Sequence, residues 1–335
     1  MEGFDTKALK QAFKSMTGND DVEFIGKDDY FDFQCQRCGQ CCMNRDDIII
    51  NPFDVFNGAR YLGIETEEFI KNYTQMHIGD GSKLPVVCLK SDPDNHGWCP
   101  LLELDILAGA KFKCKIDKAK PGACRNHPIG RVSGYQKSDN GVEVLEEQYV
   151  KVGQCPQSQG HNVMNKVSDW VANTLETPED RNAAHNLQVG MWSEKKFNLP
   201  RLYRIFEMFS RLAETMNERK ENLRDDISKK FGEEISEDEF NEVTDKAEEM
   251  LHMATSAAGM MYELIFKTTY FGYDINKPFV EQADERRKKL QKEIPHFFQL
   301  GDALYDILVQ QGSPEIQDKM RDYIEKGVLP NGDND

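Results

Sequence analysis

The chain has 335 residues, 39% hydrophobic and 10% aromatic, so it can bury a core and is not expected to be disordered. Its formal net charge of −16 argues against nucleic acid as a partner, because that binding depends on Lys and Arg neutralising phosphates. The same charge disfavours an anionic membrane surface, and no stretch reaches the roughly 20 apolar residues of a membrane-spanning helix. With no apolar secretory segment at the N-terminus, the expected location is the cytoplasm.

The first half of the chain predicts short elements separated by turns. Residues 50–63 predict a helix with Asn51 as its N-cap and Pro52 at its first position. Residues 67–76 predict a second helix that Thr66 caps. Extended segments are predicted at 84–90, 111–116 and 141–152, the last following an Asn-Gly turn signal.

The second half predicts helices, because its apolar residues recur at spacings of three and four. Ser236 and Glu239 have the spacing of a capping box at the start of a long helix. Helices are predicted at 162–176, 198–216, 277–294 and 313–329.

The cysteines mark the expected domain boundary. All nine lie between residues 35 and 155, and the 180 residues that follow contain none. We therefore predict an α+β fold with two domains. Residues 1–160 form a small cysteine-rich metal-binding domain of short helices and hairpins, and residues 161–335 form a mostly α-helical domain that supplies no metal ligand.

The run "CQRCGQCC" contains four cysteines within eight residues, Cys35, Cys38, Cys41 and Cys42. In a reducing compartment such a cluster indicates metal binding or catalysis rather than disulfides. The first three match the C-x2-C-x2-C spacing with which ferredoxins hold an iron–sulfur cluster, and Gly39 allows a tight turn among them. Zinc is the alternative, although its four-cysteine sites usually combine two short-spaced pairs. The spacing favours an iron–sulfur cluster and leaves zinc open.

The elements "CQRCGQCC", "WCPLL", "CKI" and "KPGACRNHP" resemble the zinc- or iron-chelating CxxCxxCC family, the YkgJ-type cysteine-cluster proteins. The resemblance covers about residues 30–160 and implies metal binding. It leaves Cys88 outside the ligand set, and Lys120 stands where the family usually has Arg. A weaker similarity joins this region to the cysteine-rich part of flagellin lysine-N-methylases. The ligands implied by the family are Cys35, Cys38, Cys41, Cys42, Cys99, Cys114, Cys124 and Cys155.

Adjacent cysteines point in diverging directions in extended or turn backbone, so Cys41 and Cys42 are not expected to bind one centre by simple repetition. Eight cysteines divide naturally into two groups of four, because cubane clusters and structural zinc sites each take four ligands. We therefore predict two neighbouring metal sites, or one polynuclear site, with Cys41 and Cys42 between them. His96 and His127 are candidate alternative ligands or hydrogen-bonding neighbours of the metal.

Three classes of function remain after this reading. The first is a redox protein with an iron–sulfur centre, alone or accessory to a modifying enzyme. The second is a zinc-stabilised interaction module whose helical domain binds a protein partner. The third is a protein-modifying, methyltransferase-like enzyme, although the sequence has no nucleotide-binding glycine motif and assigns no catalytic residue.

Overall fold

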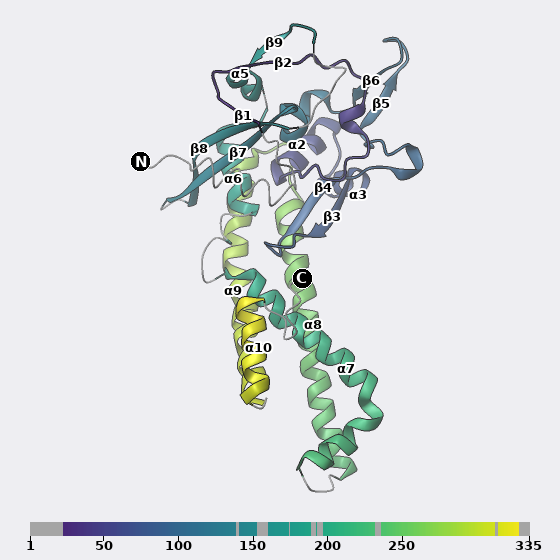
Figure 1. Ribbon diagram of the computed structural model, residues 1–335, viewed down its shortest axis with the longest axis vertical. Coiled ribbons are helices and arrows are strands. Elements are labelled where there is room, and N and C mark those ends of the chain that lie inside the picture. Colours follow the sequence, from purple (N-terminus) through teal and green to yellow (C-terminus); the bar gives the residue numbers. More distant parts are fainter. Residues whose placement is uncertain are drawn as a thin grey trace. The chain divides into compact units, whose positions relative to one another are not determined.

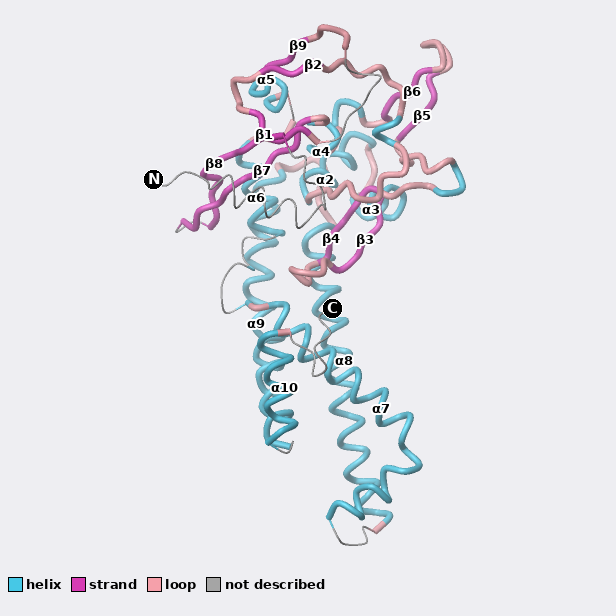
Figure 2. The backbone as a smooth tube through the Cα atoms, viewed as in Figure 1, coloured by secondary structure: helices cyan, strands magenta, loops and turns pink. Residues whose placement is uncertain are grey.

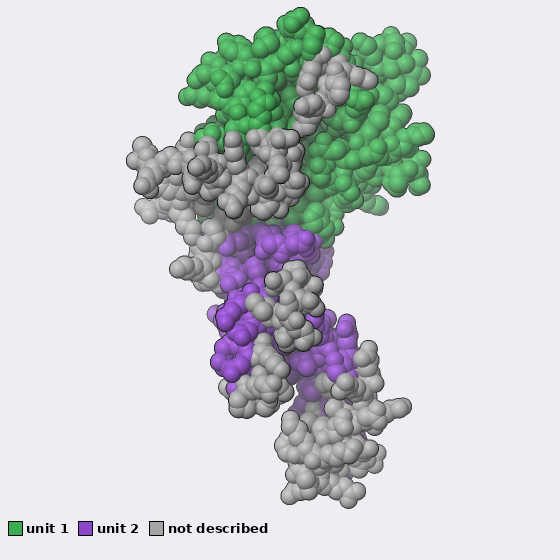
Figure 3. All heavy atoms as spheres, in the orientation of Figure 1, with its two compact units in different colours: residues 1–77, 86–191, 268–287 green, residues 78–85, 192–267, 288–335 purple. Residues whose placement is uncertain are grey.

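Small antiparallel sheets and helices make up the chain in the computed structural model, which confirms the predicted α+β class (Figure 1). Its contacts divide into two compact units (Figure 3). Unit 1 comprises residues 1–77, 86–191 and 268–287, and unit 2 comprises residues 78–85, 192–267 and 288–335. The predicted division into domains at residue 160 stays a prediction. The structure describes residues 23–138, 141–152, 160–173, 175–188, 192, 197–231, 236–311 and 314–327.

The strands of unit 1 pair in four small sheets (Figure 2). In the largest sheet, β8 (Gly141–Lys151) pairs antiparallel with both β1 (Glu23–Ile25) and β7 (Ile129–Ser138). The other pairs are β2 (Tyr30–Asp32) with β9 (Met164–Lys166), β3 (Thr74–Ile78) with β4 (Pro85–Leu89), and β5 (Leu102–Asp105) with β6 (Lys111–Cys114).

Short helices connect these strands. They are η1 (Gln40–Cys42), α2 (Pro52–Leu62), α3 (Thr66–Tyr73), η2 (Pro93–Asn95), η3 (Asp117–Ala119), α4 (Gly122–Asn126), α5 (Val167–Ala172) and α6 (Pro178–Gln188). Asn51 caps α2 as predicted, and Asp54 completes a capping box with it. The buried face of α2 meets an aromatic group, since Phe56 lies 5.8 Å from Tyr273 and Phe53 lies 5.4 Å from Phe279, ring centre to ring centre. A second core contains Ile25, Phe31, Phe33, Ile129, Tyr149, Val167 and Val171.

Two predicted elements differ from the structure. The N-cap of α3 is Glu65, so the prediction that Thr66 caps this helix is wrong; Thr66 is its first helical residue. The chain leaves α3 after Tyr73 and enters β3, because the β-branched Thr74 begins the strand instead of extending the helix. In the predicted helix 162–176, residues 164–166 form β9 and only 167–172 are helical.

Unit 2 is built from long helices. These are α7 (Leu199–Phe231), α8 (Glu237–Tyr270), α9 (Phe279–Gln311) and α10 (Pro314–Lys326), of which α8 and α9 also contribute residues to unit 1. The helix predicted after Ser236 begins at Glu237; the side chain of Glu239 and residue Ser313 lie outside the described part of the chain.

Apolar packing and one arginine join the helices of unit 2. Leu202, Ile205 and Phe209, three to four residues apart on α7, are each at most 1% exposed. Beside them, Arg201 pairs with Asp302 of α9 and Glu325 of α10, both at 2.8 Å. None of the described helices has the length and apolarity needed to cross a membrane.

Two glycines of unit 2 provide a matched test of this packing. A Cβ atom on Gly301 would lie 2.2 Å from Leu202 Cδ1, whereas one on Gly259 would meet no atom within 4 Å. Gly259→Ala is expected to raise the free energy of unfolding by up to about 1 kcal/mol through helix propensity. Gly301→Ala gains the same term but overpacks the core, which costs about 1–3 kcal/mol, so it should be the less stable variant. Urea unfolding of both measures the order, and equal stabilities would contradict the close packing of α7 against α9.

Candidate metal centre

A tight turn at Gly39 shapes the cysteine quartet. Gly39 has a left-handed backbone (φ 80°) and precedes η1, and the Cys42 N–H donates to its carbonyl at 2.8 Å. A Cβ atom at position 39 would lie 2.8 Å from both Met43 Cε and Phe112 Cδ2. Position 39 therefore requires glycine, as the sequence indicated.

A short backbone pairing places Cys42 beside Cys99. Met43 and Trp98 form an antiparallel bridge, and the Cys99 N–H donates to the Cys42 carbonyl at 2.9 Å. Next to it, Asn44 N–H donates to the Gly97 carbonyl at 2.7 Å. Gly97 has a positive φ of 69°, and a Cβ atom there would lie 1.8 Å from Asn44 Oδ1. The close approach of these two segments therefore depends on glycine.

The β5–β6 hairpin brings Cys114 to the quartet. Arg37 binds the hairpin twice, because its carbonyl accepts the Phe112 N–H and its Nε donates to the Phe112 carbonyl, both at 2.9 Å. Along the hairpin, Leu102 pairs with Cys114 at the end of β6. The thiol of Cys114 thus comes from a strand that is fixed to the segment between Cys35 and Cys38.

The buried carboxylate of Asp54 positions Cys124. Its Oδ2 accepts the Asn51 N–H at 3.0 Å within the cap of α2, and its Oδ1 accepts the Gly122 N–H at 2.9 Å. Gly122 begins α4, the helix that carries Cys124. Burial and the nearby Glu176 carboxylate raise the pKa of Asp54 to about 7. One side chain therefore ties the start of α2 to the start of the fourth cysteine segment.

Two arginines and two glutamates form an ion network behind Asp54. Glu176, with a side chain only 5% exposed, accepts hydrogen bonds from Arg131 at 3.0 Å, Arg181 at 3.2 Å and Asn51 at 3.0 Å. Arg181 also pairs with Glu147 of β8 at 2.5 Å. This network joins α2, α6, β7 and β8, so the helix that holds Asp54 is fixed to the largest sheet.

Two cavities bring the cysteines together. The smaller cavity, of about 40 Å³, has mostly apolar walls, and the larger has a volume of about 460 Å³. Cys41, Cys42 and Cys114 line both, so the cavities adjoin. Cys99 and Cys124 line only the smaller cavity, and Cys35 and Cys38 line only the larger.

Seven of the eight predicted ligands thus lie around two adjoining cavities. Cys155 is outside the described residues. Cys88 is 1% exposed in β4 and lines neither cavity, which agrees with its expected place outside the ligand set. Across the ranges that the structure describes, no three His, Cys, Asp or Glu side chains are grouped closely enough to hold a metal as they stand. The individual ligands therefore stay a prediction.

The thiols of the smaller cavity act on one another electrostatically. The Cys41 and Cys42 sulfurs are 3.8 Å apart, and a hydrogen bond from Cys42, helped by Lys120 and Arg45, lowers the pKa of Cys41 to about 6. That hydrogen bond, burial and the neighbouring thiols raise the pKa of Cys42.

The other thiols of the smaller cavity are shifted in the same direction as Cys42. Burial, with the nearby Cys114, raises the pKa of Cys99 to about 11. Burial also raises the pKa values of Cys114 and Cys124, and the Cys99 thiol adds to the effect on Cys124. Without a metal ion in the cavity, these thiols cannot all ionise together.

Two cationic side chains line the smaller cavity beside the thiols. Arg45 pairs with Asp47 at 2.5 Å, and Lys120 pairs with Asp117 at 2.5 Å. Burial lowers the pKa of Lys120, but Asp117 and Cys114 outweigh it, so the net shift is upward. Lys120, which departs from the family's usual Arg, therefore keeps a positive charge at the cavity wall.

The donor chemistry of the cavities fits zinc or iron. Thiolate sulfur is a ligand that both metals accept in proteins, and a metal cation favours the ionised thiols that burial otherwise opposes. Apolar side chains line much of the smaller cavity, and the charges of Arg45 and Lys120 favour ionised thiols there. These apolar residues are Ile48, Leu89, Leu101, Leu102 and Pro121.

The two candidate histidines differ in their surroundings. The His96 ring lies 6.0 Å from that of Trp98, and its backbone is left-handed at the end of η2. His127 follows α4 with a cis bond to Pro128 and packs edge-on against Phe33 at 5.9 Å. Neither histidine lines either cavity.

Sequence reasoning missed Asp54, Arg45 and Gly97 as parts of this site. Asp54 carries a readable local signal, since Asn51 and Asp54 have the spacing of a helix cap. Its bond to Gly122 spans 68 positions and leaves no such pattern. Gly97 acts through its contact with Asn44, which forms only when the segments near Cys42 and Cys99 pair. Arg45 pairs with Asp47, two residues away, and the fold places it at the smaller cavity.

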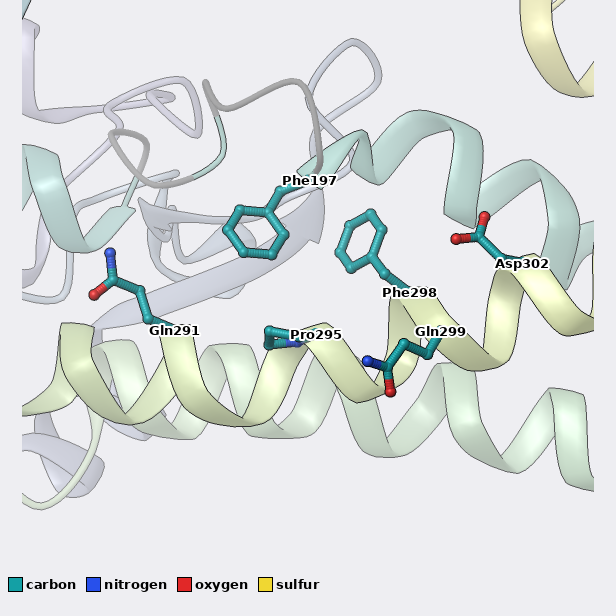
Figure 4. A pocket seen from close by; sticks show the side chains of 6 residues that line it. All are labelled: Phe197, Gln291, Pro295, Phe298, Gln299 and Asp302. Atoms are coloured by element: carbon teal, nitrogen blue, oxygen red, sulfur yellow. The ribbon is translucent and has the colours of Figure 1, made fainter.

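Unit 2 contains a separate cavity of about 280 Å³ (Figure 4). Phe197 and Phe298 lie 5.5 Å apart on its wall, between ring centres, and Pro295 lies beside them within α9. Asp302 at one end is already paired with Arg201. Gln291 and Gln299 complete the lining, so this cavity has no thiol or imidazole ligand.

Comparison with known families identifies the cysteine-rich region. Residues 34–152 match the family model CxxCxxCC, described as "Putative zinc- or iron-chelating domain". This part of the chain is similar to that family, and we refer to it as the CxxCxxCC domain. The match contains all seven described cysteines that line the cavities, and of the residues that line them only Phe33 lies outside it. Searches of curated proteins and of solved structures each found no significant match.

The hydrogen bond between Cys42 and Cys41 makes a testable difference in reactivity. In the reduced, metal-free chain, Cys41 should react with iodoacetamide at a rate that rises around pH 6 and levels off by pH 7, because the thiolate is the nucleophile. An ordinary thiol reaches its midpoint near pH 8.5. Mass spectrometry of the alkylated Cys41 peptide measures the rate.

Cys42→Ala removes the thiol that donates the hydrogen bond to Cys41. The pH at which the Cys41 reaction rate is half-maximal should then rise by one pH unit or more. Cys88→Ala, at a buried thiol outside both cavities, is the matched control and should leave the midpoint unchanged. A midpoint near 8.5 in the unsubstituted chain would contradict the hydrogen bond.

Proposed function

We propose that the CxxCxxCC domain holds an iron–sulfur centre and serves in electron transfer, alone or for a modifying enzyme. The observation that carries this proposal is the pair of adjoining cavities that share Cys41, Cys42 and Cys114. A single structural zinc is saturated by four ligands, whereas seven thiols along continuous walls suit a polynuclear centre. The larger cavity, of about 460 Å³, has room for bridging sulfide as well as iron.

The surroundings support a redox role. Burial, hydrogen bonds to sulfur and net charge set the potential of an iron–sulfur cluster. Apolar side chains line the smaller cavity, and Arg45 and Lys120 place positive charge at its wall. Both cations stabilise the more negative, reduced state of a thiolate-bound cluster, so they favour a raised potential.

We keep Cys155 as the eighth proposed ligand, because the residues on either side of its segment are anchored near the site. The Val152 N–H donates to the Pro128 carbonyl at 2.7 Å. The Gly160 N–H donates at 2.7 Å to Asp32, which lies three positions before Cys35. The residues on either side of the Cys155 segment are therefore bonded to residues within four positions of the predicted ligands Cys124 and Cys35.

Zinc is the second candidate, and the smaller cavity favours it. Its volume of about 40 Å³ and its five lining thiols suit a single tetrahedral ion. A domain that binds zinc would act as an interaction module. We predict that its protein partner binds the helical part of the chain.

Metal and sulfide analysis separates the two candidates. Protein purified without oxygen from iron-replete cells should be brown, absorb broadly in the visible range and contain acid-labile sulfide with iron. Those three properties follow from a cluster of iron and inorganic sulfide held by thiolates. Stoichiometric zinc, without iron or sulfide, would instead establish the second candidate.

Three cysteine variants test whether the cavities form one connected centre. Cys42→Ser removes a thiol that both cavities share, whereas Cys35→Ser and Cys124→Ser each affect one cavity. Metal content per chain should fall most in Cys42→Ser and only in part in the other two. Cys88→Ser is the control and should keep all of its metal. Equal losses in the first three variants would contradict the division of ligands between the cavities.

A further inference from the structure

Two consecutive residues after Cys124 contain buried polar atoms that lack partners. Asn126 Oδ1 and His127 Nε2 are inaccessible to solvent and make no hydrogen bond within the described structure. Leaving such a group unsatisfied costs about 1–3 kcal/mol, so native proteins rarely tolerate it without a bound partner. The carbonyl of Asn126 accepts the Trp170 Nε1–H at 2.9 Å, which fixes the backbone at this point.

The imidazole of His127 lies beside a residue of the larger cavity. Its ring packs against Phe33, which lines the larger cavity, and Cys38 packs against the same buried group as Phe33. Burial, together with the charge of Arg45 from the smaller cavity, lowers the pKa of His127. The ring is therefore neutral at pH 7, with one nitrogen that donates and one that accepts.

We propose that His127 Nε2–H donates a hydrogen bond to a thiolate sulfur of the metal centre. The inference rests on the proposed function, because the sulfur becomes a strong acceptor only when a metal keeps it ionised. Direct ligation by His127 is less well supported, since His127 lines neither cavity and the cysteines already supply enough ligands. His127 is thus a positioning residue that holds a sulfur and stabilises its charge.

Cadmium provides a test that does not depend on which metal the cell supplies. The full chain, labelled with ¹⁵N-histidine, is loaded with ¹¹³Cd²⁺, a diamagnetic ion that binds thiolates. On loading, the Nε2–H of His127 should become protected from exchange with water and show a weak coupling to ¹¹³Cd through the hydrogen bond. The His96 signal should not change, because His96 is the matched histidine of the same domain.

Affinity for Cd²⁺, measured by competition with a chelator, gives a second readout. Loss of a hydrogen bond to a ligand typically weakens metal binding about 10- to 100-fold, which is the loss expected for His127→Leu. His127→Gln retains an N–H donor and should recover most of the affinity. His96→Leu should bind Cd²⁺ as the unsubstituted chain does.

The outcomes separate this inference from the function on which it rests. A chain that binds no Cd²⁺ overturns the proposed metal centre and the hydrogen bond with it. A chain that binds Cd²⁺ while the His127 N–H still exchanges freely overturns only the hydrogen bond, and a buried water then satisfies the imidazole. A large one-bond coupling between ¹⁵N and ¹¹³Cd would make His127 a ligand and also overturn the inference.

Discussion

Crowded thiols impose the physical constraint on which the CxxCxxCC domain depends. At least five sulfurs line a cavity of about 40 Å³, where burial and mutual repulsion oppose their ionisation. Of these five thiols only Cys41 escapes this, because Cys42 donates a hydrogen bond to it and leaves that one thiol acidic. Such a group can persist only if the backbone holds its segments together, since the side chains themselves gain little from the contact in the absence of a cation.

The backbone meets this constraint with hydrogen bonds that do not involve the thiols. The Cys99 amide binds the Cys42 carbonyl, Arg37 binds both backbone groups of Phe112, and Asp54 binds the Gly122 amide. Each contact joins the quartet region or helix α2 to a separate cysteine segment. The buried ion network around Glu176 then fixes α2 to the sheet. The atoms that hold these segments together are thus different from the thiols proposed to bind metal, unlike a zinc finger, in which the metal itself supplies the folding energy.

Local signals in the sequence predict the helices and strands of this domain better than they predict the long-range contacts between them. The Asn51 cap, Pro52 and the glycine of the cysteine run each act on adjacent residues, and the structure contains all three features. Thr66 was a plausible cap by residue type, but Glu65 occupies that position. The long-range contacts through Asp54 and Gly97 connect residues about 50 to 70 positions apart, so periodicity and spacing leave no trace of them. The resemblance to the family supplied a ligand set, and seven of its members line the cavities.

The contacts between these segments also explain why some residues line both cavities. Cys114 lies at the end of β6, opposite Leu102 of β5. Both residues of this pair line both cavities. Cys41 and Cys42 reach both because the turn at Gly39 places them at the end of η1. The three shared cysteines therefore come from two separate elements, a hairpin and a turn, which Arg37 joins by hydrogen bonds. If metal occupies both cavities, as proposed, a change in one would therefore act on the other through these three shared sulfurs.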